Sequence, residues 1–151
     1  MCGFFTVISE NNISSKNKKI YRSIANKINH RGPDDNYFYD DNNYLSIFYR
    51  LSIRDPSLKS RQPLVSKCGR YIISFNGEIY NLEELIPDIY EKNISDTTYL
   101  LELISFKGID ILNKIRGMFA ISIYDKKECK VFITRDPLGI KPLFYIQPKQ
   151  L

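Results

Sequence analysis

The stretch GMFAISIYDKKECKVFIT, residues 117–134, decides the fold class of this chain. Apolar residues alternate with smaller or more polar ones over 119–123, and this period of two residues is that of a half-buried β-strand. The polar segment 125–128 separates this run from a second run, 129–134, which is rich in β-branched and aromatic residues. Together the two runs predict an antiparallel β-hairpin.

Further strands and helices are predicted around this hairpin. Strands are expected where β-branched and aromatic residues predominate: 4–8, 44–53, 70–75 and 143–146. Helices are expected where apolar residues recur one helical turn apart or follow a capping residue: 16–29, a short helix from the capping pattern Asn81-x-x-Glu84 to Pro87, 95–108, and one or two turns over 109–115. Helices interspersed with hairpins predict an α+β fold of antiparallel sheet covered by helices.

The composition excludes several classes of function. The chain has 151 residues, of which 43% are hydrophobic and 26% charged, as in an ordinary globular domain. No apolar run approaches the roughly 18 residues of a membrane helix, and no secretory signal is recognisable, so a cytoplasmic protein without a membrane partner is expected. The glycine spacing fits neither nucleotide-binding loop. One histidine and three cysteines without a C-x-x-C pair predict no metal site.

The net charge of +5, from 22 basic and 17 acidic residues, raises the question of nucleic-acid binding. The densest basic stretch, 16–31, coincides with a predicted helix, where a solvated face is the ordinary explanation. Acidic residues follow at once over 34–41, so no continuous basic stripe develops. We therefore expect no nucleic-acid partner.

Cys2 is the candidate nucleophile, because of its position. If Met1 is removed, Cys2 carries both a thiol and a free α-amine, whose ordinary pKa of about 7.7–8.0 leaves it partly neutral. A neutral amine within reach of the thiol can act as its general base, which needs no histidine. The alternative is a cysteine that serves only as a small buried apolar residue. Position alone leaves both interpretations open.

A series of short segments then points to a family. In chain order they are Met1-Cys2-Gly3, His30-Arg31-Gly32-Pro33-Asp34, Arg50-Leu51-Ser52-Ile53, Gln62-Pro63-Leu64, Asn76-Gly77-Glu78-Ile79-Tyr80-Asn81, Ser95-Asp96, 116–120 and 135–143. In this order they resemble the glutaminase domain of the class II (N-terminal nucleophile) glutamine amidotransferases. The resemblance is greatest to the N-terminal glutaminase domain of glutamine-hydrolysing asparagine synthetases.

The resemblance implies a fold and a reaction. The fold is a four-layer α/β/β/α sandwich of antiparallel sheets, with residues 1–151 as one glutaminase domain that we expect to be truncated at its C-terminus and to lack a synthetase domain. The reaction is hydrolysis of L-glutamine to L-glutamate and ammonia without a cofactor. The ammonia is destined for an amination, as in asparagine biosynthesis, in a separate synthetase domain or subunit. The alternative is an asparagine-synthetase-like remnant that binds glutamine or a partner without turnover.

The resemblance also assigns catalytic roles. Cys2 is the nucleophile, and the Asn76 side chain and the Gly77 backbone N–H form the oxyanion hole. From the residues alone, however, Asn76-Gly77 is the strongest short signal for a hairpin turn, and this is its better interpretation without the resemblance. We expected the two roles to be compatible, because a tight turn can direct its N–H outward. His30 is interpreted as a structural residue near the site.

The substrate-binding residues follow from the same resemblance. Arg50 would hold the α-carboxylate of glutamine, because a guanidinium group suits bidentate binding of a carboxylate. Asp96 and Glu78 would accept from the α-ammonium group. The backbone of four consecutive residues would line the pocket: Leu51, Ser52, Ile53 and Arg54. Arg54 departs from the family, which generally has a small or aliphatic residue there.

Overall fold

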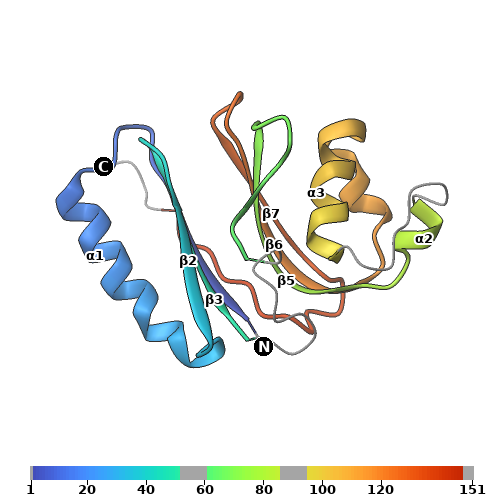
Figure 1. Cartoon of the computed structure of the whole chain (residues 1–151), viewed down its shortest axis with the longest axis horizontal. Coiled ribbons are helices and arrows are strands. Elements are labelled where there is room, and N and C mark those ends of the chain that lie inside the picture. The colour runs from blue at the N-terminus through green and yellow to red at the C-terminus, as the bar shows by residue number, and fades with distance from the viewer. Residues whose placement is uncertain (1, 52–60, 86–94, 148–151) are drawn as a thin grey trace.

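The computed structural model of the chain describes residues 2–51, 61–85 and 95–147, and its architecture is mixed α+β. In this part of the chain, two antiparallel β-sheets face each other, and helices lie on their outer faces (Figure 1). The predicted α+β class with antiparallel sheets is therefore confirmed.

The first sheet has the strand order β1-β3-β2 and is antiparallel throughout. Its strands are β1 (Gly3–Ile8), β2 (Asp35–Asp40) and β3 (Tyr44–Arg50). Helix α1 (Ser15–Ala25) covers the outer face and continues into the 3-10 helix η1 (Asn26–Arg31) (Figure 1). Leu45, Ile47 and Tyr49 belong to one buried cluster with α1, so alternate residues of β3 face the helix.

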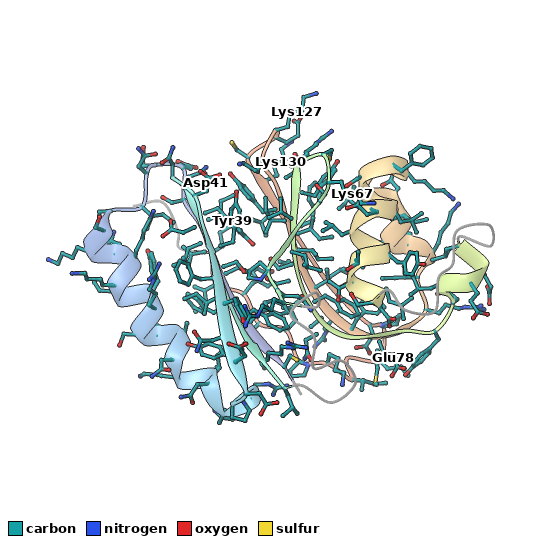
Figure 2. The ribbon with its side chains drawn as sticks, in the orientation of Figure 1. Tyr39, Asp41, Lys67, Glu78, Lys127 and Lys130 are labelled. Carbon is teal, nitrogen blue, oxygen red and sulfur yellow. The ribbon has the colours of Figure 1, made fainter. Side chains whose placement is uncertain are left out.

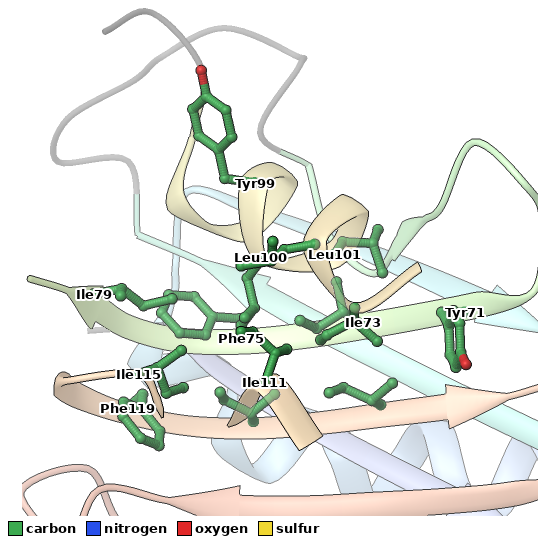
Figure 3. Close-up of a cluster of buried hydrophobic side chains, with 14 of the residues drawn as sticks. Tyr71, Ile73, Phe75, Ile79, Tyr99, Leu100, Leu101, Ile111, Ile115 and Phe119 are labelled. Carbon is green, nitrogen blue, oxygen red and sulfur yellow. The ribbon is translucent and has the colours of Figure 1, made fainter. Parts of the chain in front are cut away.

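The second sheet has the strand order β4-β5-β6-β7 and is also antiparallel. Its elements are β4 (Leu64–Val65), β5 (Tyr71–Ile79), β6 (Gly117–Asp125) and β7 (Lys130–Arg135), with α2 (Leu82–Leu85), α3 (Asp96–Lys107) and η3 (Ile109–Lys114) beside it. Ile73, Phe75 and Ile79 of β5 pack with Leu100 of α3 in the largest buried cluster (Figure 3). Odd-numbered residues of β5 therefore face α3.

Hydroxyl groups join the inner faces of the two sheets. The Oγ atoms of Ser46 in β3 and Ser74 in β5 lie 2.8 Å apart, and both residues are fully buried. Ser122 of β6 donates to Thr6 Oγ1 of β1 at 3.3 Å. A buried hydroxyl is costly unless it is hydrogen-bonded, so these pairs favour one alignment of the sheets over others.

Two stacked tyrosines extend this contact toward the other end of the sheets. The rings of Tyr44 and Tyr124 lie 4.2 Å apart between centroids, and Tyr124 donates from its hydroxyl to Asn43 Oδ1 at 2.9 Å. Burial raises the pKa of Tyr44 to about 12, so its phenol is neutral at physiological pH. The inter-sheet contact thus runs from this aromatic pair to the serine pairs.

Several predicted elements are confirmed. The hairpin is β6 and β7, whose register pairs Ile123 with Phe132, and the first predicted strand is β1. Helix α3 begins after Ser95, whose side chain accepts from Thr98 N, and ends before Gly108, which has φ of +84°. Gly108 adopts this left-handed conformation at little cost because it lacks a Cβ atom.

Other predictions at strand ends are wrong. Asn76 and Gly77 do not form a turn: they continue β5 and pair with Ala120 and Phe119 of β6. Residues 143–146 are not a strand. Phe144 and Ile146 are among the most exposed large apolar side chains in the described part of the chain. The segment contains β-forming residues, but among the described residues it has no neighbouring strand with which to pair.

Helix boundaries and two strands also differ from prediction. The helix expected over 16–29 is α only to Ala25 and 3-10 beyond it. Asn81 does not cap α2 with its side chain, which instead binds the backbone at Lys114 and Arg116. Strands β2 and β4 were not predicted. Ser52 and Ile53 of the strand expected over 44–53, and Pro87, lie outside the described residues.

Asp136 fixes the segment after β7 to β6. Its buried carboxylate accepts from Ile140 N at 2.8 Å, Lys141 N at 3.0 Å and Phe119 N at 3.2 Å. Burial alone would raise the pKa of Asp136, but these backbone donors outweigh it, and the pKa is lowered. The ionised carboxylate therefore stabilises the fold.

Replacing Asp136 should change the acid stability of the protein. The pKa of Asp136 is lower in the folded protein than in the unfolded chain, where an Asp pKa is about 3.9. The ionised carboxylate therefore contributes its full stabilisation above about pH 3.9. This contribution is lost as the pH falls through the lower, folded-state pKa. Asp136→Asn should therefore unfold at lower urea concentration than wild type at pH 7, and the difference should shrink below about pH 4. Urea unfolding across pH tests this. The exposed Asp110→Asn is the control, and a difference that is independent of pH would contradict the assignment.

Candidate active site

Cys2 lies immediately before β1, and its thiol is partly exposed. Its sulfur receives the N–H of Leu51 at 3.4 Å and lies 3.8 Å from Leu51 O. Arg31 Nε donates to Cys2 O at 3.4 Å. The register that pairs Gly3 with Tyr49 brings Cys2 to the end of β3, and these contacts hold it there.

Arg50 is the last residue of β3, and only 6% of it is exposed. A lone arginine in a strand is usually on the surface, so its burial beside Cys2 is informative. Arg50 shares the inner face of β3 with Ser46, because side chains alternate along a strand. By the same alternation Cys2 shares the inner face of β1 with Thr6. Both predicted site residues therefore lie on the faces that meet the second sheet.

Gly32 allows the backbone before β2 to lie directly against the end of β3. A Cβ atom at Gly32 would lie 2.2 Å from the carbonyl carbon and oxygen of Tyr49 and 2.5 Å from Arg50 N. Asp34 N donates to Arg50 O at 3.1 Å. The 30–34 segment is thus a wall of the site. His30 is exposed, with its Nδ1 3.2 Å from Lys27 O, and its structural role stays a prediction.

An open hollow of about 310 Å³ lies beside two residues that contact Cys2. The described residues that line it are His30, Arg31, Pro33 and Leu51, of which Arg31 and Leu51 contact Cys2 directly. A second hollow, of about 230 Å³, lies on the other side of Pro33, toward Tyr49 and η1. Of these two hollows, only the first is lined by Arg31 and Leu51, so it is the candidate substrate side of the site.

Asn76, Gly77 and Glu78 lie at the end of β5. Asn76 and Glu78 share a face of the strand with Ser74, which contacts the first sheet, so they face the sheet that carries Cys2. Asn76 is 8% exposed, whereas Gly77 is exposed. Glu78 lies at the lower edge of the molecule in Figure 2, away from the exposed Lys67, Lys127 and Lys130.

Gly77 has its N–H on the outer side of the β5–β6 ladder. Tyr80 N donates to Arg116 O, and Lys126 N donates to Arg70 O. The backbone N–H and C=O groups of even-numbered residues of β5 therefore bond to β6, and those of odd-numbered residues point toward β4. Gly77 is odd-numbered, and within the described part of the chain its N–H has no hydrogen-bond acceptor. A Cβ at Gly77 would lie 2.1 Å from Met118 O, so only glycine fits.

Asp96 lies at the first turn of α3 and is partly buried. Its Oδ2 accepts from Ile79 N at 3.0 Å, which ties the helix to the end of β5. Asp96 is therefore held against the strand that carries Asn76 and Gly77, but one of its oxygens already has a backbone donor. Gln62, which the sequence marks only as part of the motif Gln62-Pro63-Leu64, also binds this strand, through Phe75.

The two groups of predicted residues lie at the same edge of the facing sheets. From Thr6 back to Cys2, and from Ser74 on to Gly77, the chain covers roughly 10–13 Å at about 3.3 Å per residue. Because Thr6 and Ser74 belong to the same inter-sheet contact, both paths lead to the lower edge in Figure 1. Ser52, Ile53 and Arg54 lie outside the described residues, and their predicted role stays a prediction.

The described part of the chain, residues 2–51, 61–85 and 95–147, shows neither a metal-binding cluster nor a membrane-spanning helix. Within these ranges, no group of three or more His, Cys, Asp or Glu side chains is arranged to hold a metal ion. No helix in the same ranges is long and apolar enough to span a membrane.

Comparison with known proteins decides the family. The whole chain, residues 1–151, matches the family described as glutamine amidotransferase domain. This chain belongs to that family. It is 38% identical to asparagine synthetase [glutamine-hydrolyzing] 2 of Bacillus subtilis over 99% of this chain and 20% of the relative. It is 34% identical to asparagine synthetase B [glutamine-hydrolyzing] of Escherichia coli over 95% of this chain and 26% of the relative.

The amidotransferase chain therefore spans about a fifth to a quarter of the length of these relatives. Asparagine synthetase [glutamine-hydrolyzing] 1 of Bacillus subtilis is 38% identical over 96% of this chain and 24% of its own length. The chain is homologous to the N-terminal part of glutamine-hydrolysing asparagine synthetases, as the motif series indicated.

Gly32→Ala tests the packed wall beside Cys2. The added Cβ must displace the end of β3, which should cost about 1–3 kcal/mol of unfolding free energy and loosen the Leu51 contact to the thiol. Alkylation of Cys2 by iodoacetamide, followed by peptide mass spectrometry, should become faster, while alkylation of the exposed Cys68 stays unchanged.

Gly69→Ala is the matched control for this test. Gly69 has φ of +73° and open space around its Cβ position, so alanine there should cost a similar 1–2 kcal/mol, roughly, through backbone strain alone. Its effect on Cys2 alkylation should be nil. Equal acceleration in both variants would show that global destabilisation, and not the wall, controls access to the thiol.

Proposed function

We propose that this domain hydrolyses L-glutamine to L-glutamate and ammonia, with Cys2 as an N-terminal nucleophile. The observation that carries the proposal is the shared inner-face placement of Cys2, Arg50 and Asn76 at one edge of the two sheets. We also infer that α1, the two sheets and α3 are the layers of the α/β/β/α sandwich of N-terminal nucleophile amidotransferases. Membership in the amidotransferase family supports both inferences.

The reaction starts at the thiol. Once Met1 is removed, the free α-amine of Cys2 takes the thiol proton, and the sulfur attacks the amide carbon of glutamine. A carbon–sulfur bond forms, and the carbonyl oxygen becomes an oxyanion. The outward Gly77 N–H and the Asn76 side-chain amide donate to this oxyanion, in a position where little reorganisation is needed.

The tetrahedral intermediate then collapses toward products. The carbon–nitrogen bond breaks, and the α-ammonium group gives its proton to the leaving nitrogen, which departs as ammonia. Water then attacks the thioester, with the same amine as general base, through a second oxyanion at Gly77 and Asn76. Cleavage of the carbon–sulfur bond releases glutamate and restores the thiol of Cys2.

Charged side chains at the site match the amino-acid end of glutamine. Arg50, almost fully buried, supplies a guanidinium group for the α-carboxylate, and Asp96 and Glu78 supply carboxylates for the α-ammonium group. The backbone from Leu51 to Arg54 completes the pocket. The ammonia then serves a synthetase domain or subunit, in keeping with the relatives, which are named glutamine-hydrolysing asparagine synthetases.

Cys2→Ala should abolish glutaminase turnover without unfolding the protein. Loss of a covalent nucleophile lowers kcat by about 10⁴-fold or more. Ammonia release from glutamine measures the activity, and intact mass after treatment with a diazoketone analogue of glutamine should show one adduct, on Cys2. Cys68→Ala is the matched control and should retain both. Turnover that survives in Cys2→Ala would refute the mechanism, and glutamine binding without turnover in wild type would favour the remnant alternative.

Asn76→Ala should separate catalysis from binding. Removal of one oxyanion donor lowers kcat by about 10²–10³-fold and leaves KM for glutamine little changed. Arg50→Lys should do the reverse, because an ammonium group cannot make the bidentate carboxylate contact, so KM should rise while kcat changes less. Steady-state kinetics of both variants test the assignment. A large KM effect with an unchanged kcat in Asn76→Ala would contradict the oxyanion role.

A further inference from the structure

Gln62 uses its whole side-chain amide at the edge of β5. Its Oε1 accepts from Phe75 N at 2.6 Å, and its Nε2 donates to Phe75 O at 3.1 Å and to Thr97 Oγ1 at 3.3 Å. Only 7% of the residue is exposed. A buried side chain with every polar atom bonded is rigid, and its removal leaves several groups without partners.

The register explains why a side chain is needed here. Strand β4 pairs Leu64 with Ile73 and Val65 with Ile72, so the same register sets Gln62 opposite Phe75. Gln62 does not add a backbone rung to the ladder. Its side-chain amide supplies the donor and acceptor that Phe75 requires, and the β4–β5 ladder ends there.

The next donors along this edge of β5 are Gly77 N and Ile79 N. Ile79 N donates to Asp96 Oδ2 at 3.0 Å, so side chains hold the backbone on both sides of Gly77. Gln62 also bonds to Thr97, the neighbour of Asp96 in α3. One amide therefore connects the strand before Gly77 to the helix that carries Asp96.

We propose that Gln62 is a positioning residue for the amidotransferase site. Its side chain ends the β4–β5 ladder at Phe75, so the next outward N–H, that of Gly77, remains available to the oxyanion. Gln62 also fixes the position of Asp96 relative to the Gly77 N–H. Gln62 acts through Gly77 and Asp96 and does not touch the reacting atoms. This inference rests on the proposed glutaminase function and adds to it a residue that sets the geometry of the oxyanion hole.

Gln62→Glu tests the hydrogen bonds most directly, because it keeps the size and shape of the side chain. A carboxylate still accepts from Phe75 N, but it cannot donate to Phe75 O or Thr97 Oγ1. The strand and the helix should therefore move apart at Gly77. A misplacement on the order of 1 Å can cost about 10²-fold in rate, so we expect kcat to fall by roughly 10–100-fold.

Asn81→Asp is the matched control. Asn81 is also a buried amide, 5% exposed, and its side chain also pairs with the backbone, donating to Lys114 O at 3.0 Å and accepting from Arg116 N at 2.7 Å. The same amide-to-acid change there removes a comparable donor just beyond the end of β5, where the side chain bonds to the segment before β6 and not to β5 or α3. Asn81→Asp should lower the unfolding free energy in the same way. It should keep kcat within about twofold of wild type, a change in activation free energy of less than about 0.5 kcal/mol.

The experiment compares kcat, KM and urea unfolding for wild type, Gln62→Glu and Asn81→Asp, with hydrogen exchange of the Phe75 and Gly77 amides by NMR. A fall in kcat that is specific to Gln62→Glu supports the inference. An equal fall in both variants, scaled to their stability, overturns it. In wild type we expect a slowly exchanging Phe75 amide and a rapidly exchanging Gly77 amide.

Failure of the proposed function has a different signature. If wild type releases no ammonia from glutamine, the glutaminase proposal fails, and the Gln62 inference is then decided by exchange alone. Loss of Phe75 protection and a changed Gly77 amide resonance in Gln62→Glu, with neither in Asn81→Asp, support its role in holding the strand. Unchanged exchange and resonances in Gln62→Glu overturn it.

Discussion

The paired hydroxyls between the two sheets are the contact on which the rest of the structure depends. Ser46 with Ser74, and Ser122 with Thr6, are satisfied only when the sheets meet in one alignment, since a shift would leave buried hydroxyls without partners. That alignment determines where Cys2 lies relative to the end of β5. A site assembled from two sheets needs such a constraint, because apolar contacts alone tolerate sliding.

Close backbone contacts give the site its walls. Gly32 lies on the end of β3, and Gly77 and Gly117 let β5 and β6 approach where a Cβ would lie about 2.1 Å from a carbonyl oxygen. Each glycine therefore brings backbone groups to a place that a side chain would otherwise occupy. At Gly77 the result is an N–H at an exposed residue beside the buried Asn76, on a strand whose odd-numbered apolar residues are packed against α3.

Local signals predicted the parts of the fold that depend on local interactions. The β6–β7 hairpin and the capped helix after Ser95 were predictable, since alternation and capping act within a few residues. Strand β2 was missed because its alternating Tyr37 and Tyr39 are set among aspartate and asparagine. Asn76-Gly77 was misread as a turn because the need for glycine comes from Met118, far away in the sequence.

The candidate site shows the same division. The place of Cys2 beside the terminus was visible in the sequence, whereas the role of Gln62 depends on the register between β4 and β5. A backbone N–H can bind a developing oxyanion only if the sheet does not use it. The Gln62 amide before Gly77 and the Asp96 carboxylate after it meet this condition. Each accepts from one backbone N–H of β5, and neither brings a neighbouring strand up to the glycine. The proposed oxyanion donor therefore depends on where β-pairing stops as much as on the residue that carries it.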